Sequence, residues 1–186
     1  SLTGDAHAAS ILDKDVYPHP VVATLHGRWD ADHYASHLCQ AARYYNNALL
    51  VIEVNGVGEA VQNRARRLYH NFYHRLPVDR EVRMPGERIG WYTGPYTTRP
   101  TLIEGVASAV RDRELVCWDR EVILQCLSFH AIPGPRQAEA KPGSHDDHVF
   151  GLGMAIQGLS YTTIDELRHY NRKKHRAVAQ HMGAFR

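Results

Sequence analysis

A short aliphatic run that ends in an acidic residue is the feature that most restricts the fold. Residues 49–52 read Leu-Leu-Val-Ile, and Glu53 follows them directly. A continuous aliphatic run without period-two alternation is typical of a parallel strand that is covered on both faces. The Asn-Gly-Val-Gly sequence of residues 55–58 then breaks the strand, since glycine permits a tight turn into a following helix. The pattern predicts a central strand with a carboxylate at its end.

The segments around this strand are predicted to be a mixture of strands and helices. Strands are expected at residues 6–13 and 19–29, which lie close enough for an antiparallel hairpin, and at residues 114–118. Helical spacing of apolar residues predicts helices at residues 30–48, 57–72, 101–113, 119–130 and 146–159. Residues 131–145 contain prolines and glycines that predict a hairpin. The order indicates one α/β domain with a mixed sheet.

Charge and cysteine usage narrow the class of protein. The formal net charge is only +2, but arginines and lysines cluster in residues 64–88 and 168–176, as is usual for a protein with a polyanionic partner. Solvated surface and a loose basic tail are the alternative explanation. The three cysteines have no metal-binding spacing and are expected to be reduced core residues of a cytosolic protein. No apolar run reaches the length of a membrane span, and no secretory signal is present.

Three carboxylates are the candidates for chemistry. Glu53 ends the aliphatic strand, and Asp146 and Asp147 open the last predicted helix. A strand end and a helix start can meet at one edge of an α/β sheet, where such folds bind ligands. Converging carboxylates repel one another unless a cation neutralises them, and oxygen ligands favour Mg²⁺ or Mn²⁺. A helix cap for either aspartate, and a solvated strand end for Glu53, are the alternatives.

Three ordered motifs resemble those of a known family. Residues 49–75 contain a Glu-x-Asn-x-x-Gly strand and helix, residues 89–110 contain Gly-Trp-x-Thr followed by Thr-Arg, and residues 138–157 contain Gly-x-His-Asp-Asp. In this order and spacing they resemble the nuclease domain of the large terminase subunits of tailed bacteriophages. The resemblance implies an RNase H-like α/β fold, with a mixed five-stranded central sheet flanked by helices and an extra hairpin before the last helix. It covers residues 1–160, leaving residues 161–186 as a basic C-terminal helix or tail.

The resemblance also implies an activity and its residues. It implies a divalent-metal-dependent endonuclease that cuts concatemeric viral DNA during genome packaging, with Glu53, Asp146 and Asp147 as catalytic ligands of two Mg²⁺ or Mn²⁺ ions. The Gly-Asp of residues 4–5 resembles a later segment of the family, so the family's first-strand aspartate is expected to lie before Ser1, and Asp5 is only a weak candidate for it. Phosphate contacts are expected from five basic residues: Arg64, Arg67, Arg75, Arg99 and Lys141.

The resemblance finally implies partners and a location. These are double-stranded viral DNA, an ATPase domain of the same polypeptide, a portal protein and a small terminase subunit, in the cytoplasm of an infected bacterial host, with no role for membranes, virion or secretion. Two other functions stay open, because a fold does not determine its substrate. One is another RNase H-like nuclease that resolves junctions or cleaves RNA. The other is a non-catalytic module that docks on DNA or a portal.

Overall fold

The centre of the described structure is a small three-stranded sheet. The computed structural model describes residues 6–74, 89–131, 138–159 and 161. Strand β1 (His7–Leu12) pairs antiparallel with β2 (His19–Gly27), and β2 pairs parallel with the short β3 (Leu115–Val116). The order β1-β2-β3 leaves β1 at one edge. The expected hairpin and the mixed character of the sheet are therefore confirmed.

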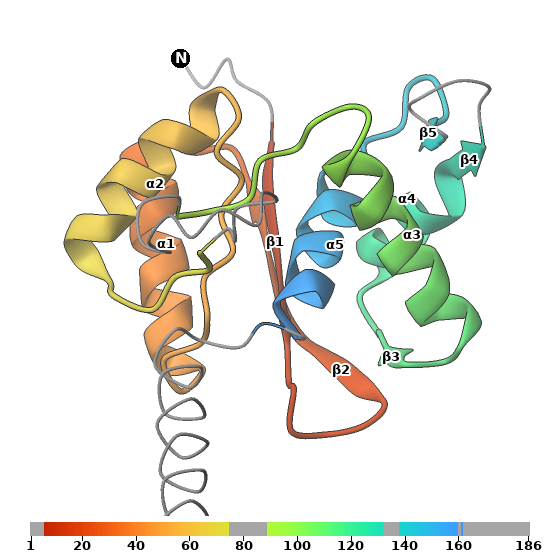
Figure 1. The fold of residues 1–186 in the computed structure, drawn as a ribbon, viewed down its shortest axis with the longest axis horizontal. Coiled ribbons are helices and arrows are strands. Elements are labelled where there is room, and N and C mark those ends of the chain that lie inside the picture. The colour runs from red at the N-terminus through yellow and green to blue at the C-terminus, as the bar shows by residue number, and fades with distance from the viewer. Residues whose placement is uncertain (1–5, 75–88, 132–137, 160, 162–186) are drawn as a thin grey trace, which may run out of the picture.

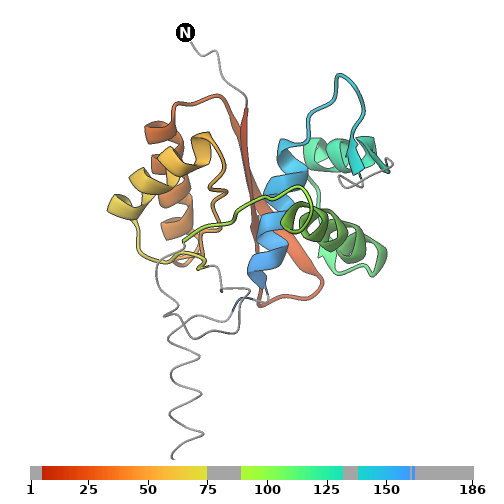
Figure 2. The same ribbon diagram turned by 45° about the horizontal axis from the view of Figure 1, so that its top comes forward.

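Helices lie on both sides of this sheet (Figures 1 and 2). On one side are α1 (Ala31–Tyr44) and α2 (Val57–Leu68). On the other side are α3 (Thr98–Arg111), α4 (Arg120–Ser128) and α5 (Asp147–Leu159). The helices begin and end close to the boundaries that the apolar spacing predicts.

Two hydrophobic clusters correspond to the two helical layers. Ala9 and its strand partner Leu25 pack on the cluster formed with α1 and α2. Leu12 and its partner Val21 belong to the cluster formed with α3, α4 and α5. The sheet thus separates two cores, as expected when apolar side chains leave both faces of a strand pair.

The aliphatic run that predicts a central strand takes a different form. Residues 49–53 form no regular strand; Leu50 makes an isolated parallel bridge to Phe72, and Glu53 makes one to Trp91. The Leu50 and Ile52 carbonyls accept hydrogen bonds from Tyr73 and Trp91, respectively. The segment is therefore extended and paired on one side, but it does not join β1. The predicted strand is a chain of isolated bridges outside the sheet of β1 to β3.

The expected hairpin before the last helix is present. Strand β4 (Phe129–Ala131) pairs antiparallel with β5 (Ala138–Ala140). In the described parts of the chain the strands form sheets of three and two members, so the five-stranded sheet that the resemblance implies is not seen there. The basic tail at residues 162–186 lies outside the described residues, as do Asp5 and Arg75.

Candidate acidic site

Glu53 is held by hydrogen bonds on either side of it. The Trp91 amide donates to the Ile52 carbonyl, and the Val54 amide donates to the Trp91 carbonyl, both over 2.7 Å. The side chain of Asn55 then clamps the neighbouring loop: its amide nitrogen donates to the Thr93 carbonyl (2.9 Å), and its oxygen accepts from the Thr93 amide (2.8 Å). The backbone on both sides of Glu53 is therefore held by hydrogen bonds, to Trp91 directly and to Thr93 through the Asn55 side chain.

The glycines after Glu53 are required by close approach and by backbone conformation. A side chain at position 58 would place its Cβ 1.9 Å from the Glu53 carbonyl oxygen, so only glycine fits there. Gly56 has φ +55°, a value that residues with side chains rarely adopt. The turn predicted from residues 55–58 is confirmed, and it brings the N-terminus of α2 against the backbone of Glu53.

Asp146 and Asp147 lie at the start of α5, as expected. The Asp146 carbonyl accepts from the amides of Val149 and Phe150, and Asp147 is the first helical residue. Burial raises the pKa of the Asp146 carboxyl above its usual value, and the neighbouring charge of Asp147 raises it further. Two aspartates that cap other helices have pKa values that are lowered instead.

Those two aspartates show what a capping carboxylate looks like in this molecule. Asp30 accepts from the His33 amide at the start of α1, and Asp119 accepts from the Glu121 amide at the start of α4. The His33 amide lowers the pKa of Asp30, and the hydrogen bond from Thr24 lowers that of Asp119. Asp146 has a raised pKa instead, because burial and the neighbouring charge of Asp147 outweigh the interactions that lower it.

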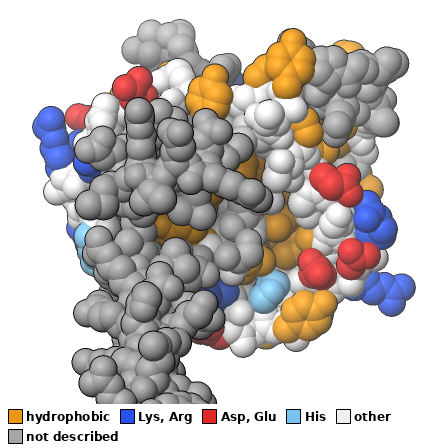
Figure 3. All heavy atoms as spheres, viewed as in Figure 1, with side chains coloured by type: hydrophobic (Ala, Val, Ile, Leu, Met, Phe, Trp, Pro, Cys, Tyr) orange, Lys and Arg blue, Asp and Glu red, His pale blue; other side chains and the backbone are white. Residues whose placement is uncertain are grey.

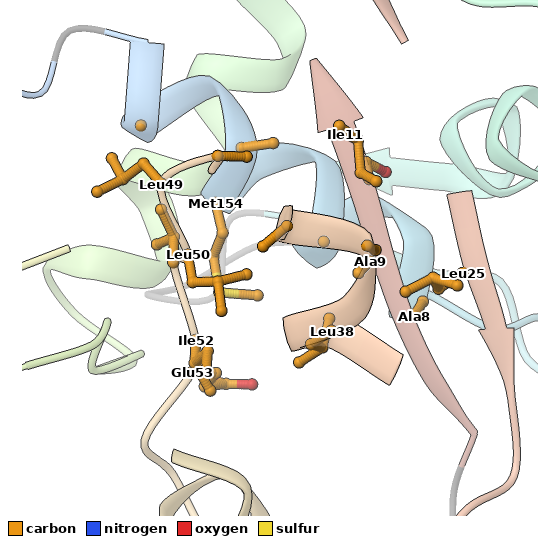
Figure 4. A pocket seen from close by; sticks show the side chains of 18 of the residues that line it. Ala8, Ala9, Ile11, Leu25, Leu38, Leu49, Leu50, Ile52, Glu53 and Met154 are labelled. Atoms are coloured by element: carbon orange, nitrogen blue, oxygen red, sulfur yellow. The ribbon is translucent and has the colours of Figure 1, made fainter. Parts of the chain in front are cut away.

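All three candidate carboxylates line one groove of about 1390 Å³. It runs between β1 and the segment that leads to Glu53, with α1 and α5 contributing the remaining walls. In the close-up, Glu53 ends the row that begins with Leu49 and Leu50, while Ala8 and Ala9 of β1 lie across from it (Figure 4). The groove is mostly apolar, and its acidic groups are Asp13, Glu53, Asp146 and Asp147, together with Asp15 and Asp30.

The buried hydroxyl of Tyr34 is part of the same surroundings. It donates to the Ala8 carbonyl over 2.9 Å. Burial raises its pKa, and the nearby charge of Asp147 contributes to the same shift. Tyr34 therefore stays protonated and donates to β1 beside the acidic groove.

The donor set suits a hard divalent cation, but it is not assembled into a cluster. Among the described residues, no three His, Cys, Asp or Glu side chains are arranged to hold a metal ion. Carboxylate oxygens are the ligands that Mg²⁺ and Mn²⁺ prefer, and a cation would relieve the unfavourable charge of Asp146 beside Asp147. The chemistry of the residues therefore fits the expected metal, although the described residues do not form a group of three ligands.

The basic residues expected to contact DNA are distributed rather than gathered. Arg99 lies near Asp146, where its Nη1 donates to the Ala138 carbonyl (2.8 Å) and its guanidinium lies 5.2 Å from the Phe150 ring centroid. Arg64 pairs with Asp32 at 3.8 Å. Arg67 and Lys141 are exposed. On the face in Figure 3, the described lysines and arginines lie toward the edges, and hydrophobic side chains are visible between the two groups of helices.

Several residues near the site are missed by reasoning from the sequence. Asn55 belongs to the Glu-x-Asn motif, but its clamp on Thr93 depends on two segments 38 residues apart. His148 is also buried, at 1% exposed. Its ring lies 4.7 Å from that of His26, and burial lowers its pKa. A histidine directly after two aspartates gives no sequence signal of such burial.

Comparisons with known proteins agree with the fold. The chain is similar to the large terminase nuclease from thermophilic phage G20c, whose crystal structure contains bound cobalt. The TM-score is 0.54 at 16% sequence identity, and the match covers 82% of this chain and 81% of that chain. At this identity the likeness establishes a shared fold.

Two further comparisons, with protein families and with curated sequences, give no match. No protein-family model matches the chain. No curated protein sequence matches it either. In the described part of the chain, none of the helices combines the length and the apolar character needed to cross a membrane.

Proposed function

We propose that this chain is a divalent-metal-dependent endonuclease of the RNase H-like class. The observation that carries the proposal is the position of Glu53, Asp146 and Asp147 on one groove, with Asp146 partly buried beside the like charge of Asp147. A cation is the simplest group that would compensate such carboxylates. The shared fold with a terminase nuclease that was solved with cobalt supports the same reading.

The residues of the groove have separable roles in this mechanism. Glu53, Asp146 and Asp147 would hold the ions, which supply an activated water and stabilise the leaving 3′ oxygen of the phosphodiester. Asn55 and Gly58 keep the backbone of Glu53 in place through their contacts with Thr93 and with the Glu53 carbonyl. Arg99 lies near Asp146 and places a positive charge next to the carboxylates. The chain thus provides ligands and their positioning.

The finer biological role follows from the sequence motifs. The substrate is concatemeric double-stranded viral DNA, cut in the cytoplasm of an infected bacterium during genome packaging. Arg67, Lys141, Arg64 and Arg99 would contact phosphates, together with Arg75. An ATPase domain of the same polypeptide, a portal protein and a small terminase subunit are the proposed partners. A nuclease with mainly phosphate contacts has little sequence preference and a strong dependence on salt.

The first prediction tests the carboxylates directly. Glu53→Ala and Asp147→Ala are each expected to abolish Mn²⁺-dependent nicking of supercoiled plasmid DNA, because each removes a metal ligand. The melting temperature of Asp147→Ala without metal should stay the same or rise, since the like charge beside Asp146 is removed, and that of Glu53→Ala should stay the same. Gel analysis of plasmid topology and thermal unfolding with and without Mn²⁺ measure the two effects.

Glu59→Ala is the matched control for these variants. Glu59 is an exposed carboxylate in the first turn of α2 that does not line the groove. The control should retain both nicking and the rise in melting temperature that Mn²⁺ causes in the unaltered chain. A large loss of stability in the two site variants, with nicking retained, would show that Glu53 and Asp147 serve the fold only.

A second candidate is a non-catalytic module that docks on DNA or a portal. The absence of a three-residue metal group in the described chain is the observation that favours it. The two candidates differ in their response to metal: the docking module binds DNA without Mn²⁺ and never nicks it. Cleavage of four-way junctions and RNA–DNA hybrids, measured beside linear duplex, separates the terminase role from other nucleases of the same fold.

A further inference from the structure

Two glutamines are buried in the part of the chain that the structure describes. Gln62 in α2 and Gln125 in α4 are each 8% exposed. A buried amide is unfavourable unless it is hydrogen-bonded, so each glutamine requires a partner that an aliphatic side chain would not need. Both find that partner in the backbone beside the segments that carry the candidate carboxylates, although neither glutamine lines the groove itself.

Gln125 connects α4 to the start of α5. Its Oε1 accepts a hydrogen bond from the His148 amide over 2.8 Å, in a buried contact. His148 is the second residue of α5, and the first amides of a helix have no partner within the helix. A side chain just before the helix usually satisfies them, but this acceptor lies 23 residues away in the chain. The bond therefore fixes the backbone directly after Asp147 from a different helix.

A comparison of two helix starts shows what this arrangement leaves free. In α4 the amide of the second helical residue, Glu121, donates over 2.8 Å to the carboxylate of Asp119, directly before the helix. α5 has an aspartate in the same place, Asp146, but the equivalent amide, that of His148, donates to Gln125. The Asp146 carboxylate therefore does not have to accept from this amide, and it keeps more of its lone pairs for another partner.

Gln62 holds the other half of the acidic site from α2. Its Nε2 donates to the Ile89 carbonyl over 2.7 Å. Ile89 lies two residues before Trp91, whose backbone bonds to the residues on either side of Glu53. A Cβ at position 90 would lie 2.7 Å from the Ile52 carbonyl oxygen and 3.4 Å from Nε2 of Gln62. The glutamine amide and the extended segment of Glu53 are thus packed against the same residue.

Apolar packing between α4 and α5 is already supplied by other side chains. The two helices lie side by side (Figures 1 and 2), and Val122 and Cys126 of α4 share one cluster with Leu152 and Ile156 of α5. Apolar contacts have no preferred direction, whereas a buried hydrogen bond has one and specifies a unique arrangement of the groups that it joins. Gln125 therefore adds a constraint on position to a contact that is already packed.

We infer that Gln125 and Gln62 are positioning residues of the acidic site, which hold Asp146–Asp147 and Glu53 in the arrangement that a divalent cation requires. The inference rests on the proposed function, since it gives both glutamines a role in metal binding. Neither side chain touches the ion: Gln125 acts through the backbone after Asp147, and Gln62 acts through the segment paired with Glu53. Altering a group that orients metal ligands typically changes metal affinity by roughly 10- to 100-fold.

Metal binding by two variants tests the inference. Gln125→Met and Gln62→Met keep a side chain of similar length and remove its hydrogen bond. Calorimetric titration of the full chain with Mn²⁺ should show binding that is roughly tenfold weaker, or more, in each variant. Half-maximal nicking of plasmid DNA should need correspondingly more Mn²⁺. The rate at saturating Mn²⁺ should stay close to that of the unaltered chain, because all the carboxylates are still present.

Val122→Ala is the control that separates positioning from stability. Val122 lies in α4, is 1% exposed and packs in the cluster with Leu152 of α5. The variant should melt at a lower temperature, because it leaves a cavity, but it should bind Mn²⁺ as the unaltered chain does. In the metal-free chain, amide exchange followed by NMR should show the His148 amide protected in Val122→Ala and unprotected in Gln125→Met.

If Gln125→Met does not fold, two other variants still decide the question. One is Gln62→Met, and the other is Gln125→Asn, whose shorter side chain cannot reach the His148 amide from the same backbone position. Both should weaken Mn²⁺ binding in the same way.

The possible failures are distinguishable. If either glutamine variant that folds bound Mn²⁺ as tightly as Val122→Ala does, the glutamines would serve the fold only and the inference would be overturned. Unchanged protection of the His148 amide in Gln125→Met would overturn it as well, because the bond would then not hold the start of α5. An unaltered chain that neither binds Mn²⁺ nor nicks DNA would instead refute the proposed function, and with it any role of the glutamines in metal binding.

Discussion

At the level of single residues, the ionised form of Asp146 is less favourable in the folded chain than in the unfolded chain. Its carboxyl is desolvated and lies next to Asp147, and both effects raise its pKa. A carboxyl whose pKa is higher in the folded chain than in the unfolded chain reduces stability once it is ionised in the folded state. The penalty is complete above the folded pKa, and it disappears as the pH falls to the unfolded value of about 3.9.

Replacing this carboxyl gives the second prediction. Asp146→Asn should raise the melting temperature at pH 7 in the absence of metal, because the unfavourable charge is removed. The advantage over the unaltered chain should shrink as the pH falls from the raised pKa of Asp146 toward about 4. Thermal unfolding followed by circular dichroism from pH 4 to pH 8 measures both trends.

The exposed residue Asp112 provides the control, since Asp112→Asn also replaces an aspartate but removes no buried carboxyl. Mn²⁺ should reverse the order at pH 7, stabilising the unaltered chain more than Asp146→Asn. An Asp146→Asn variant that is less stable at pH 7 would contradict the desolvation argument.

Asp119 is the opposite case and gives the third prediction. It caps α4 through the amides of Glu121 and Val122 and also accepts from the Thr24 hydroxyl of β2. Asp119→Ala should cost about 1–2 kcal/mol, because the cap and the link to the sheet are both lost. Asp119→Asn should lose less, as asparagine is an equally good cap. Urea unfolding at pH 7 measures the difference.

The pH dependence of Asp119 has the opposite sign to that of Asp146. Its lowered pKa means that its contribution to stability is present above about pH 3.9 and is lost as the pH falls through the folded pKa. If the stabilities of Asp119→Ala and the unaltered chain were equal at pH 7, the capping bonds would contribute nothing measurable.

The sequence predicts that an aspartate begins a helix, but it does not distinguish a capping aspartate from a buried one. An aspartate before an apolar helical pattern is typical of a cap, and Asp30 and Asp119 are both such caps. The same local pattern occurs at Asp146, where the pKa is raised instead of lowered. The difference arises from burial and from Asp147, and burial depends on segments distant in the chain.

At the level of elements, the turn between the extended segment and α2 fixes the backbone of Glu53. Gly58 is helical, and replacing a helical glycine with alanine usually stabilises a protein by about 0.5–1 kcal/mol. At this position the new Cβ would lie 1.9 Å from the Glu53 carbonyl oxygen, so the backbone has to move. The usual sign of the substitution should therefore be reversed.

The fourth prediction uses this reversal. Gly58→Ala should lower the free energy of unfolding and reduce Mn²⁺-dependent nicking, because it displaces Glu53. Gly105→Ala in α3 is the control: its Cβ would lie 2.9 Å from the Nε2 end of the flexible Gln157 side chain and at an ordinary 3.8 Å from Ile156, so its stability should be unchanged or higher. Urea unfolding and plasmid nicking distinguish the two, and equal stability of both variants would contradict the close approach.

Element types were predictable where a local pattern decides them. The helices and the hairpin of β1 and β2 follow from apolar spacing and from a short connection. Residues 49–53 show the limit of this reasoning: their composition favours a buried strand, but a strand also needs neighbours on both edges. The described chain supplies a neighbour on one edge only, and sequence composition does not encode which neighbour is present.

At the level of the whole molecule, the two-sided covering of the sheet was predictable, but the groove was not. Alternating strands and helices predict layers on both faces of a sheet, as observed (Figure 2). The groove depends on the relative positions of β1, α1, α5 and residues 49–53, which no single motif specifies. For the same reason, the sequence identified the three carboxylates but could not show that the described residues form no group of three metal ligands.

The glycines of α5 also determine when this helix can form during folding. Gly151, Gly153 and Gly158 approach β1, Leu102 and Val51, respectively, and each glycine costs about 1 kcal/mol of helix stability relative to alanine. By contrast, α1 contains no glycine and four alanines. An α5 that is isolated from its neighbours should therefore remain unfolded, and it should become helical only once β1 and α3 are in place to pack against it.

The fifth prediction compares the two helices as peptides. A peptide of residues 146–160 should show almost no helix by circular dichroism in water and should need more trifluoroethanol to become helical than a peptide of residues 30–45. Equal helicity of the two peptides would contradict this. A late-forming α5 means that Asp146 and Asp147 reach the groove in the closing steps of folding, so incompletely folded chains would carry Glu53 without its acidic partners.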